Sequence, residues 1–155
     1  MRTAVRMSDL EDLLEAWGED ASLDNVELDR ASMTTPVIHA RYMRLLPESR
    51  IVLRGLETGR RELSRTLRDY YSGALNDPEK LESIKRPPYP RKLIRTELDT
   101  YVNSDAEMLK LDNRISICRE YVEACQEILR QVNNRNWTVR NIIEWRRLTQ
   151  FSDDG

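Results

Sequence analysis

The most regular hydrophobic pattern of the chain lies in its last third. Apolar residues recur there in steps of three and four, at Met108, Leu111, Ile115, Cys118, Val122, Cys125, Leu129 and Val132. This spacing is typical of a long amphipathic helix with an apolar seam. A second row runs beside it, formed by Ile117, Tyr121, Ala124 and Ile128. Two adjacent seams are more than one chain is expected to bury, so the pattern predicts a multi-helix assembly.

We therefore assign oligomerisation to the residues of the first seam, namely Leu111, Ile115, Cys118, Val122, Cys125, Leu129 and Val132. Asn133 and Asn134 are expected to end this helix. Thr138 then becomes the candidate N-cap of a final helix that continues towards the C-terminus.

Shorter patterns predict helices in the first half. One runs from Asp9 to Trp17, opened by the capping-box spacing at Ser8 and ended by Gly18. A weakly amphipathic stretch covers residues 24–32. Pro36 and Pro47 each suit the first turn of a new helix.

The helix that begins at Pro47 is expected to continue to Tyr71, and Gly73 is its stop signal. Asp77 followed by Pro78 predicts the start of a short helix that ends near Ile84. The segment Lys85–Lys92 follows, with three prolines in four residues, and favours an extended arm.

These elements predict an all-α fold of amphipathic helices, with a long C-terminal helix packing into a multi-helix oligomer. Three regions are expected: residues 1–75 with an acidic start and a basic helix, 76–96 as a short helix and Pro-rich basic linker, and 97–155 for oligomerisation. The composition agrees, because 155 residues with 34% charged, 39% hydrophobic and a single Phe suit amphipathic helices better than a large sheet core.

The sequence predicts a soluble, cytosolic protein. It contains no run of about 18 apolar residues, as a membrane span needs, and no signal peptide is recognisable. Cys118 and Cys125 are expected to be buried thiols in a reducing compartment. A glycine-rich phosphate loop is missing and His39 is the sole histidine, so we expect no enzyme, metal or cofactor.

Charge is distributed unevenly along the chain, although the net charge is only -2. Nine acidic residues and no basic one lie between Ser8 and Asp29, whereas nine arginines face four acids between Arg30 and Leu75. The acidic segment either solvates the protein or docks a basic surface, and the sequence leaves both open.

Basic and aromatic residues occur together in the middle of the chain, as single-stranded nucleic acid requires for phosphate neutralisation and base stacking. The candidates are Arg54, Arg60, Arg61, Arg65, Arg68, Tyr70, Tyr71, Lys85, Arg86, Tyr89, Arg91 and Lys92. Two alternatives stay open. The arginines could form a salt-bridged solvent face, and the proline-rich arm could bind an acidic partner protein.

Several motifs, in order, resemble those of the UvsY family, the recombination mediators of large tailed phages. They are Asp9-Leu10-Glu11-Asp12-Leu13, Arg68-Asp69-Tyr70-Tyr71-Ser72-Gly73, the stretch from Ser104 to Asp112, and Ile142-Ile143-Glu144-Trp145-Arg146-Arg147-Leu148. The family's DNA contacts lie on the basic helix before the two tyrosines. The first matches Arg65; the second falls on Leu67, a departure, with Arg68 next to it.

The resemblance implies a protein that binds single-stranded DNA and acts in the cytoplasm of the infected bacterial host. It implies loading of a RecA-like phage recombinase in place of the phage single-stranded-DNA-binding protein. It also implies a homo-oligomeric ring of about six to eight subunits. The alternative hypothesis is a helical oligomeric scaffold or adaptor without direct nucleic-acid binding.

Overall fold

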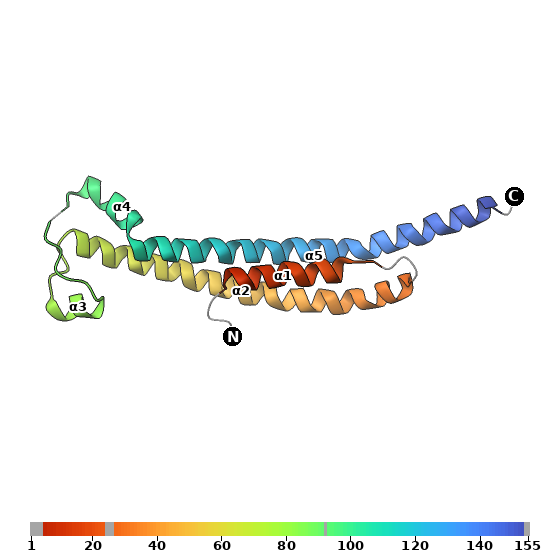
Figure 1. Cartoon of the computed structure of the whole chain (residues 1–155), viewed down its shortest axis with the longest axis horizontal. Coiled ribbons are helices and arrows are strands. Elements are labelled where there is room, and N and C mark those ends of the chain that lie inside the picture. Colours follow the sequence, from red (N-terminus) through yellow and green to blue (C-terminus); the bar gives the residue numbers. More distant parts are fainter. Residues whose placement is uncertain (1–4, 24–26, 92, 154–155) are drawn as a thin grey trace. The chain divides into compact units, whose positions relative to one another are not determined.

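The computed structural model describes residues 5–23, 27–91 and 93–153, and helices are its only regular elements (Figure 1). They are α1 (Met7–Ala21), α2 (Leu28–Tyr71), α3 (Pro78–Ser83), α4 (Arg95–Ser104) and α5 (Ala106–Asp153). The predicted all-α class with a long C-terminal helix is therefore confirmed.

The chain forms two compact units: unit 1 joins two segments that are distant in sequence, and unit 2 is one continuous segment. Unit 1 contains Met1–Val52 and Ile117–Gly155, and unit 2 contains Leu53–Ser116. These units cut across the three regions expected from the sequence, because α2 and α5 each contribute one segment to both units.

In unit 1, α1 lies alongside α2 and α5 (Figure 1). The Trp17 ring meets the Tyr42 ring edge to face, with centroids 5.8 Å apart. Asp20, near the end of α1, accepts hydrogen bonds from Arg41 at 2.6 Å and from the Tyr42 hydroxyl at 2.9 Å. The guanidinium of Arg135 on α5 donates to the backbone oxygens of Asp20 and Ser22. These contacts fix the C-terminal end of the acidic helix to the rest of unit 1.

The long seam of α5 is buried within the single chain. Of the seven residues assigned to oligomerisation, Leu111 is half-buried and six are buried, namely Ile115, Cys118, Val122, Cys125, Leu129 and Val132. In the second row, Tyr121 and Ile128 are also buried. The premise that one chain cannot cover these seams is wrong, because the chain's own helices cover them. Both cysteines are buried thiols, as predicted.

Unit 2 has a small apolar core of its own. Leu67 of α2, Val102 of α4 and Met108 of α5 are almost completely buried, and Leu63 and Tyr71 pack against them. Gly73 ends α2 with a positive φ of 76°, a conformation that favours glycine. The side chain of Asp77 caps α3 by accepting a hydrogen bond from the amide of Glu79. The predicted stop signal and the predicted start of α3 are thus confirmed.

Several predicted helix ends are wrong. α2 runs without a break through Pro36 and Pro47, both of which lie on its exposed side. A proline inside a helix cannot donate to the carbonyl four residues earlier, but burial of neighbouring apolar residues such as Ile38 and Tyr42 holds the helix together. Intrinsic breaking signals are weaker here than tertiary packing.

α5 likewise continues through Asn133 and Asn134, where a helix end was expected. Thr138 is not an N-cap, because its hydroxyl donates back to the carbonyl of Asn134 within the same helix. α1 begins at Met7, with Arg6 as N-cap instead of Ser8, and passes through Gly18 to Ala21. Buried Val132, Arg135 and Val139 bridge the predicted break in α5.

In the part of the chain that the structure describes, no helix is long and apolar enough to cross a membrane.

Candidate nucleic-acid interface

Three arginines of α2 form an exposed basic surface on unit 2. Arg54, Arg61 and Arg65 are separated by seven and four residues, so they lie on one side of the helix. All three are exposed, and Arg61 donates to the Thr58 hydroxyl at 3.1 Å. Among the described residues, no ion pair is formed by any of these three. We call Arg54, Arg61 and Arg65 the arginine face.

Two other predicted arginines of α2 are already neutralised. Arg60 forms an ion pair with Asp112 of α5, with its Nε 2.5 Å from the carboxylate. Arg68 pairs with Asp99 of α4. Both ion pairs connect α2 to other helices of unit 2 instead of following the helix itself. The structure therefore separates the five predicted arginines of α2 into an open group of three and a paired group of two.

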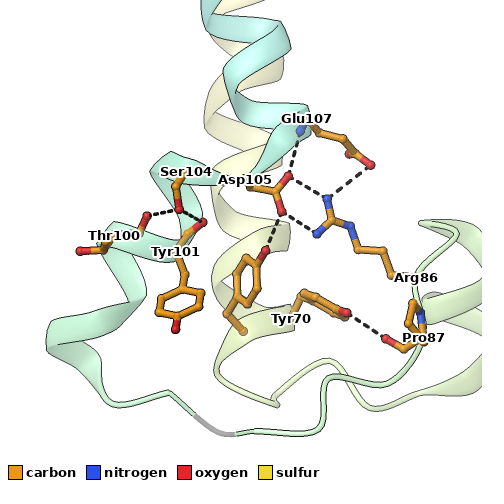
Figure 2. A network of polar contacts seen from close by, with 9 residues as sticks. Tyr70, Arg86, Pro87, Thr100, Tyr101, Ser104, Asp105 and Glu107 are labelled. Atoms are coloured by element: carbon orange, nitrogen blue, oxygen red, sulfur yellow. Dashed lines mark hydrogen bonds and ion pairs between the residues drawn. The ribbon is translucent and has the colours of Figure 1, made fainter.

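Arg86, just after α3, also has a protein partner. Its Nη1 and Nη2 donate to the two carboxylate oxygens of Asp105 at 2.7 and 2.9 Å. These side chains are only 16% and 4% exposed, and Arg86 also lies 3.3 Å from Glu107 (Figure 2). A guanidinium held in two parallel hydrogen bonds is not available for a phosphate.

Asp105 joins three parts of unit 2. It separates α4 from α5, and its Oδ1 accepts the amide hydrogen of Glu107 at 2.9 Å, which caps the start of α5. Its Oδ2 accepts the hydroxyl hydrogen of Tyr71, the last residue of α2, at 2.7 Å. Together with Arg86, this carboxylate ties the loop after α3 to the ends of three helices.

These contacts shift the pKa values of the groups involved. The two hydrogen bonds from Arg86 lower the pKa of Asp105 from 3.8 to about 2, against the opposing effect of burial. Burial, helped by the hydrogen bond to Asp105, raises the pKa of Tyr71 to about 12. The hydrogen bonds to Asp105 also raise the pKa of Arg86. Each shift favours the charge state that the network needs at neutral pH.

Four tyrosines gather beside this network. The Tyr71 ring lies 4.9 Å from the Tyr89 ring and 5.8 Å from the Tyr101 ring, measured between centroids. Tyr70 lies 5.1 Å from Tyr71 and 5.3 Å from Tyr89. Tyr70 is buried, its ring lies under the Arg86 guanidinium at 5.2 Å, and its hydroxyl donates to the carbonyl of Pro87. Tyr70 is therefore enclosed by protein on several sides.

The proline-rich arm is non-helical, as predicted, and several contacts hold it against unit 2. Besides Arg86 and Pro87, its end is fixed by the amide of Leu93, which donates to the carbonyl of Tyr71 at 3.3 Å. Lys85 is exposed, and so is Arg91, which lies 3.4 Å from Glu97. Lys92 lies outside the described residues. The arm thus presents two exposed cations from a tethered backbone.

The acidic partners of these arginines were not predicted from the sequence. Asp99 lies on α4, Asp112 lies on α5 and Asp105 lies between these helices, each more than 18 residues away in the chain from the arginine it binds. The sequence contained one signal for a role of Asp105, namely its position directly before a helix, where an aspartate can act as a cap. Nothing in the local sequence marks it as the partner of Arg86. Tyr101, on α4, was also not among the candidates.

The described residues form an all-helical protein without a β-strand. Its arginine face is a basic surface that suits polyanions. The sequence profile of the family described as recombination, repair and single-stranded-DNA-binding protein UvsY matches residues 16–150. This match spans most of the chain, so the protein belongs to the UvsY family.

Solved structures with the same fold are crystal structures of the recombination mediator protein UvsY of bacteriophage T4. In one lattice the TM-score is 0.77 at 17% identity, covering 89% of this chain and 98% of the T4 chain. In two other lattices the TM-score is 0.73, at 17% and 18% identity, with 90% of this chain covered. No curated protein sequence matches the chain.

Proposed function

We propose that this chain binds single-stranded DNA through the arginine face and acts as a recombination mediator. In this role it promotes loading of a RecA-like recombinase in place of single-stranded-DNA-binding protein during phage homologous recombination and repair. The observation that carries the proposal is the exposure of Arg54, Arg61 and Arg65 without carboxylate partners among the described residues. Membership of a family described as binding single-stranded DNA supports it.

The proposed mechanism needs binding alone. Arginines that neutralise phosphates release counterions, which gives sequence-independent affinity for the strand. A homo-oligomer repeats the arginine face, and linked weak sites raise the effective concentration of DNA at each of them. Such a surface holds a strand moderately well, so a recombinase can still displace it.

The homo-oligomer in this proposal needs a surface other than the buried seam of α5. Unit 1 exposes large apolar side chains that a second copy could cover: Met33 (78% exposed), Val37 (65%), Trp137 (68%), Trp145 (68%) and Leu148 (65%). Exposed apolar surface of this kind is typical of contact sites between proteins.

A salt titration tests DNA binding. Fluorescence anisotropy of a labelled oligothymidylate should give affinities that fall with salt, with a log–log slope of about −2 per subunit for three arginine–phosphate contacts. Replacing Arg54, Arg61 and Arg65 together by Ala should abolish most of this slope. A matched control replaces Arg30, Arg44 and Arg130, which changes the net charge equally but removes arginines paired with Glu27, Glu48 and Glu127.

A second function is favoured by the ion pairs of Arg60 and Arg68, because in them two arginines of the basic helix bind carboxylates of the same protein. In that case the chain is an oligomeric scaffold or adaptor that does not bind nucleic acid directly. Undetectable DNA binding at low salt by the intact wild-type oligomer would favour this function and exclude the first.

A further inference from the structure

We propose that Tyr101 and Tyr89 form a platform on which the unpaired bases of single-stranded DNA stack, and that Arg86 and Asp105 position this platform instead of binding DNA. The inference rests on the proposed function, and it adds the bases as ligands to the phosphates bound by the arginine face. It begins from an unequal exposure among the four tyrosines of unit 2.

Tyr70 and Tyr71 are the inner members of the cluster. Tyr70 is 6% exposed and its hydroxyl donates to the carbonyl of Pro87. The Tyr71 hydroxyl donates to the carboxylate of Asp105. Tyr89 is half-buried and Tyr101 is 36% exposed. Among the described residues, no hydrogen bond holds the hydroxyl of either outer ring. Tyr101 is therefore the ring that a ligand reaches most readily, and half-buried Tyr89 contacts the same inner ring, Tyr71.

Tyr71 sets the positions of both outer rings. Its ring contacts Tyr89 at a nearly perpendicular angle of 88° and contacts Tyr101 at 58°. Tyr71 is fixed in turn by its 2.7 Å hydrogen bond to Asp105, which Arg86 holds from the other side. Figure 2 shows Tyr101 on α4 with its hydroxyl pointing away from Asp105. The network thus fixes the inner ring and leaves the Tyr101 ring at the surface.

The surroundings suit a nucleic-acid strand better than an apolar partner. Aromatic rings bind every base through its π-face, and nearby cations bind the connecting phosphates. Exposed Lys85 comes from the same tethered arm that carries Tyr89. Arg95, the first residue of the helix that carries Tyr101, is exposed as well. Aromatic rings on elements that also carry exposed cations suit a single strand, which offers both bases and phosphates.

The test compares two oligomers of equal length, oligothymidylate and an abasic phosphodiester strand that lacks bases. Wild type is expected to bind the thymidylate at least tenfold more tightly than the abasic strand at the same salt concentration. Tyr101→Leu should lose most of this preference while keeping the salt slope, and Tyr101→Phe should retain it. Ile94→Ala, which removes another exposed side chain beside α4 (64% exposed), is the matched control and should behave as wild type.

The outcomes separate this inference from the function on which it rests. Equal binding of both strands by wild type would overturn the stacking platform and leave the arginine face standing. A thymidylate preference that persists in Tyr101→Leu would also overturn it. Undetectable binding of either strand would overturn both proposals.

A second measurement does not depend on any variant. Photo-crosslinking of wild type to an oligonucleotide with 5-iodouracil, followed by peptide mapping, should place crosslinks on Tyr101 and Tyr89. Crosslinks found only on α2 would contradict the inference.

Discussion

The guanidinium of Arg86 and the carboxylate of Asp105 are joined by two hydrogen bonds of 2.7 and 2.9 Å, in surroundings that leave the two side chains 16% and 4% exposed. Arg86 follows α3, whereas Asp105 separates α4 from α5. One ion pair therefore fixes the geometry of a basic arm that the sequence alone would describe as a free linker.

Removing one partner of this pair should destabilise unit 2. Arg86→Ala leaves the buried carboxylate of Asp105 without its counter-charge, and such changes cost about 3 to 5 kcal/mol. Chemical denaturation followed by near-ultraviolet circular dichroism of the tyrosines measures the effect. Arg91→Ala, which breaks the exposed contact with Glu97, should cost no more than about 1 kcal/mol. Equal losses in the two variants would contradict the structural role of Arg86.

The same pair should make unit 2 sensitive to acid. The pKa of Asp105 is lowered from 3.8 to about 2 in the folded protein, so its contribution is complete above a pH of about 4 and is lost as the pH falls towards 2. The shift corresponds to a contribution on the order of 2 kcal/mol. Urea denaturation at pH 5 and at pH 2.5 measures this loss. Asp105→Asn should be less stable at pH 5 and should show a smaller difference between the two pH values.

Freeing the paired arginines of α2 should strengthen DNA binding. Asp112→Asn and Asp99→Asn remove the partners of Arg60 and Arg68, which then become available to phosphates. Each freed arginine that reaches a phosphate should steepen the log–log salt slope by about 0.7. Anisotropy titrations over a range of salt concentrations measure this change in the salt slope. Unchanged slopes in both variants would show that Arg60 and Arg68 lie away from the strand.

Charge placed on α5 should have different effects at buried and at exposed positions. Val122 is 8% exposed within the single chain, so Val122→Asp should unfold unit 1 instead of simply dissociating an oligomer. Trp145 is 68% exposed, so Trp145→Glu should retain the helical content. If the exposed apolar surface of unit 1 joins subunits, the second variant should also show a lower mass by light scattering. A wild-type mass would place the contact between subunits elsewhere.

The sequence predicted the helical class and the seam of α5, because a 3.6-residue periodicity is a local property that a single chain displays. It did not predict what covers the seam. Cys118, for example, donates to the carbonyl of Ser49, a residue 69 positions away, and no spacing rule connects them. The conclusion that a second chain must cover the seam failed for this reason.

The candidate interface was predicted in part. The arginines of α2 could be found from their spacing, because they share one helix. Their division into open and paired groups depends on Asp99 and Asp112, which the fold brings to Arg68 and Arg60. In the same way, the sequence marked Tyr70 and Tyr71 as a motif, but their burial follows from packing with Tyr89 and Tyr101.

The two prolines within α2 have a consequence for its backbone. Pro36 and Pro47 supply no amide hydrogen, so the carbonyls of Ser32 and Met43 lose their usual donor in the helix. Both of these residues are exposed, and Met43 is 54% accessible. The outer side of α2 in unit 1 therefore carries two peptide oxygens that depend on solvent, or on a donor from another molecule, for a hydrogen bond.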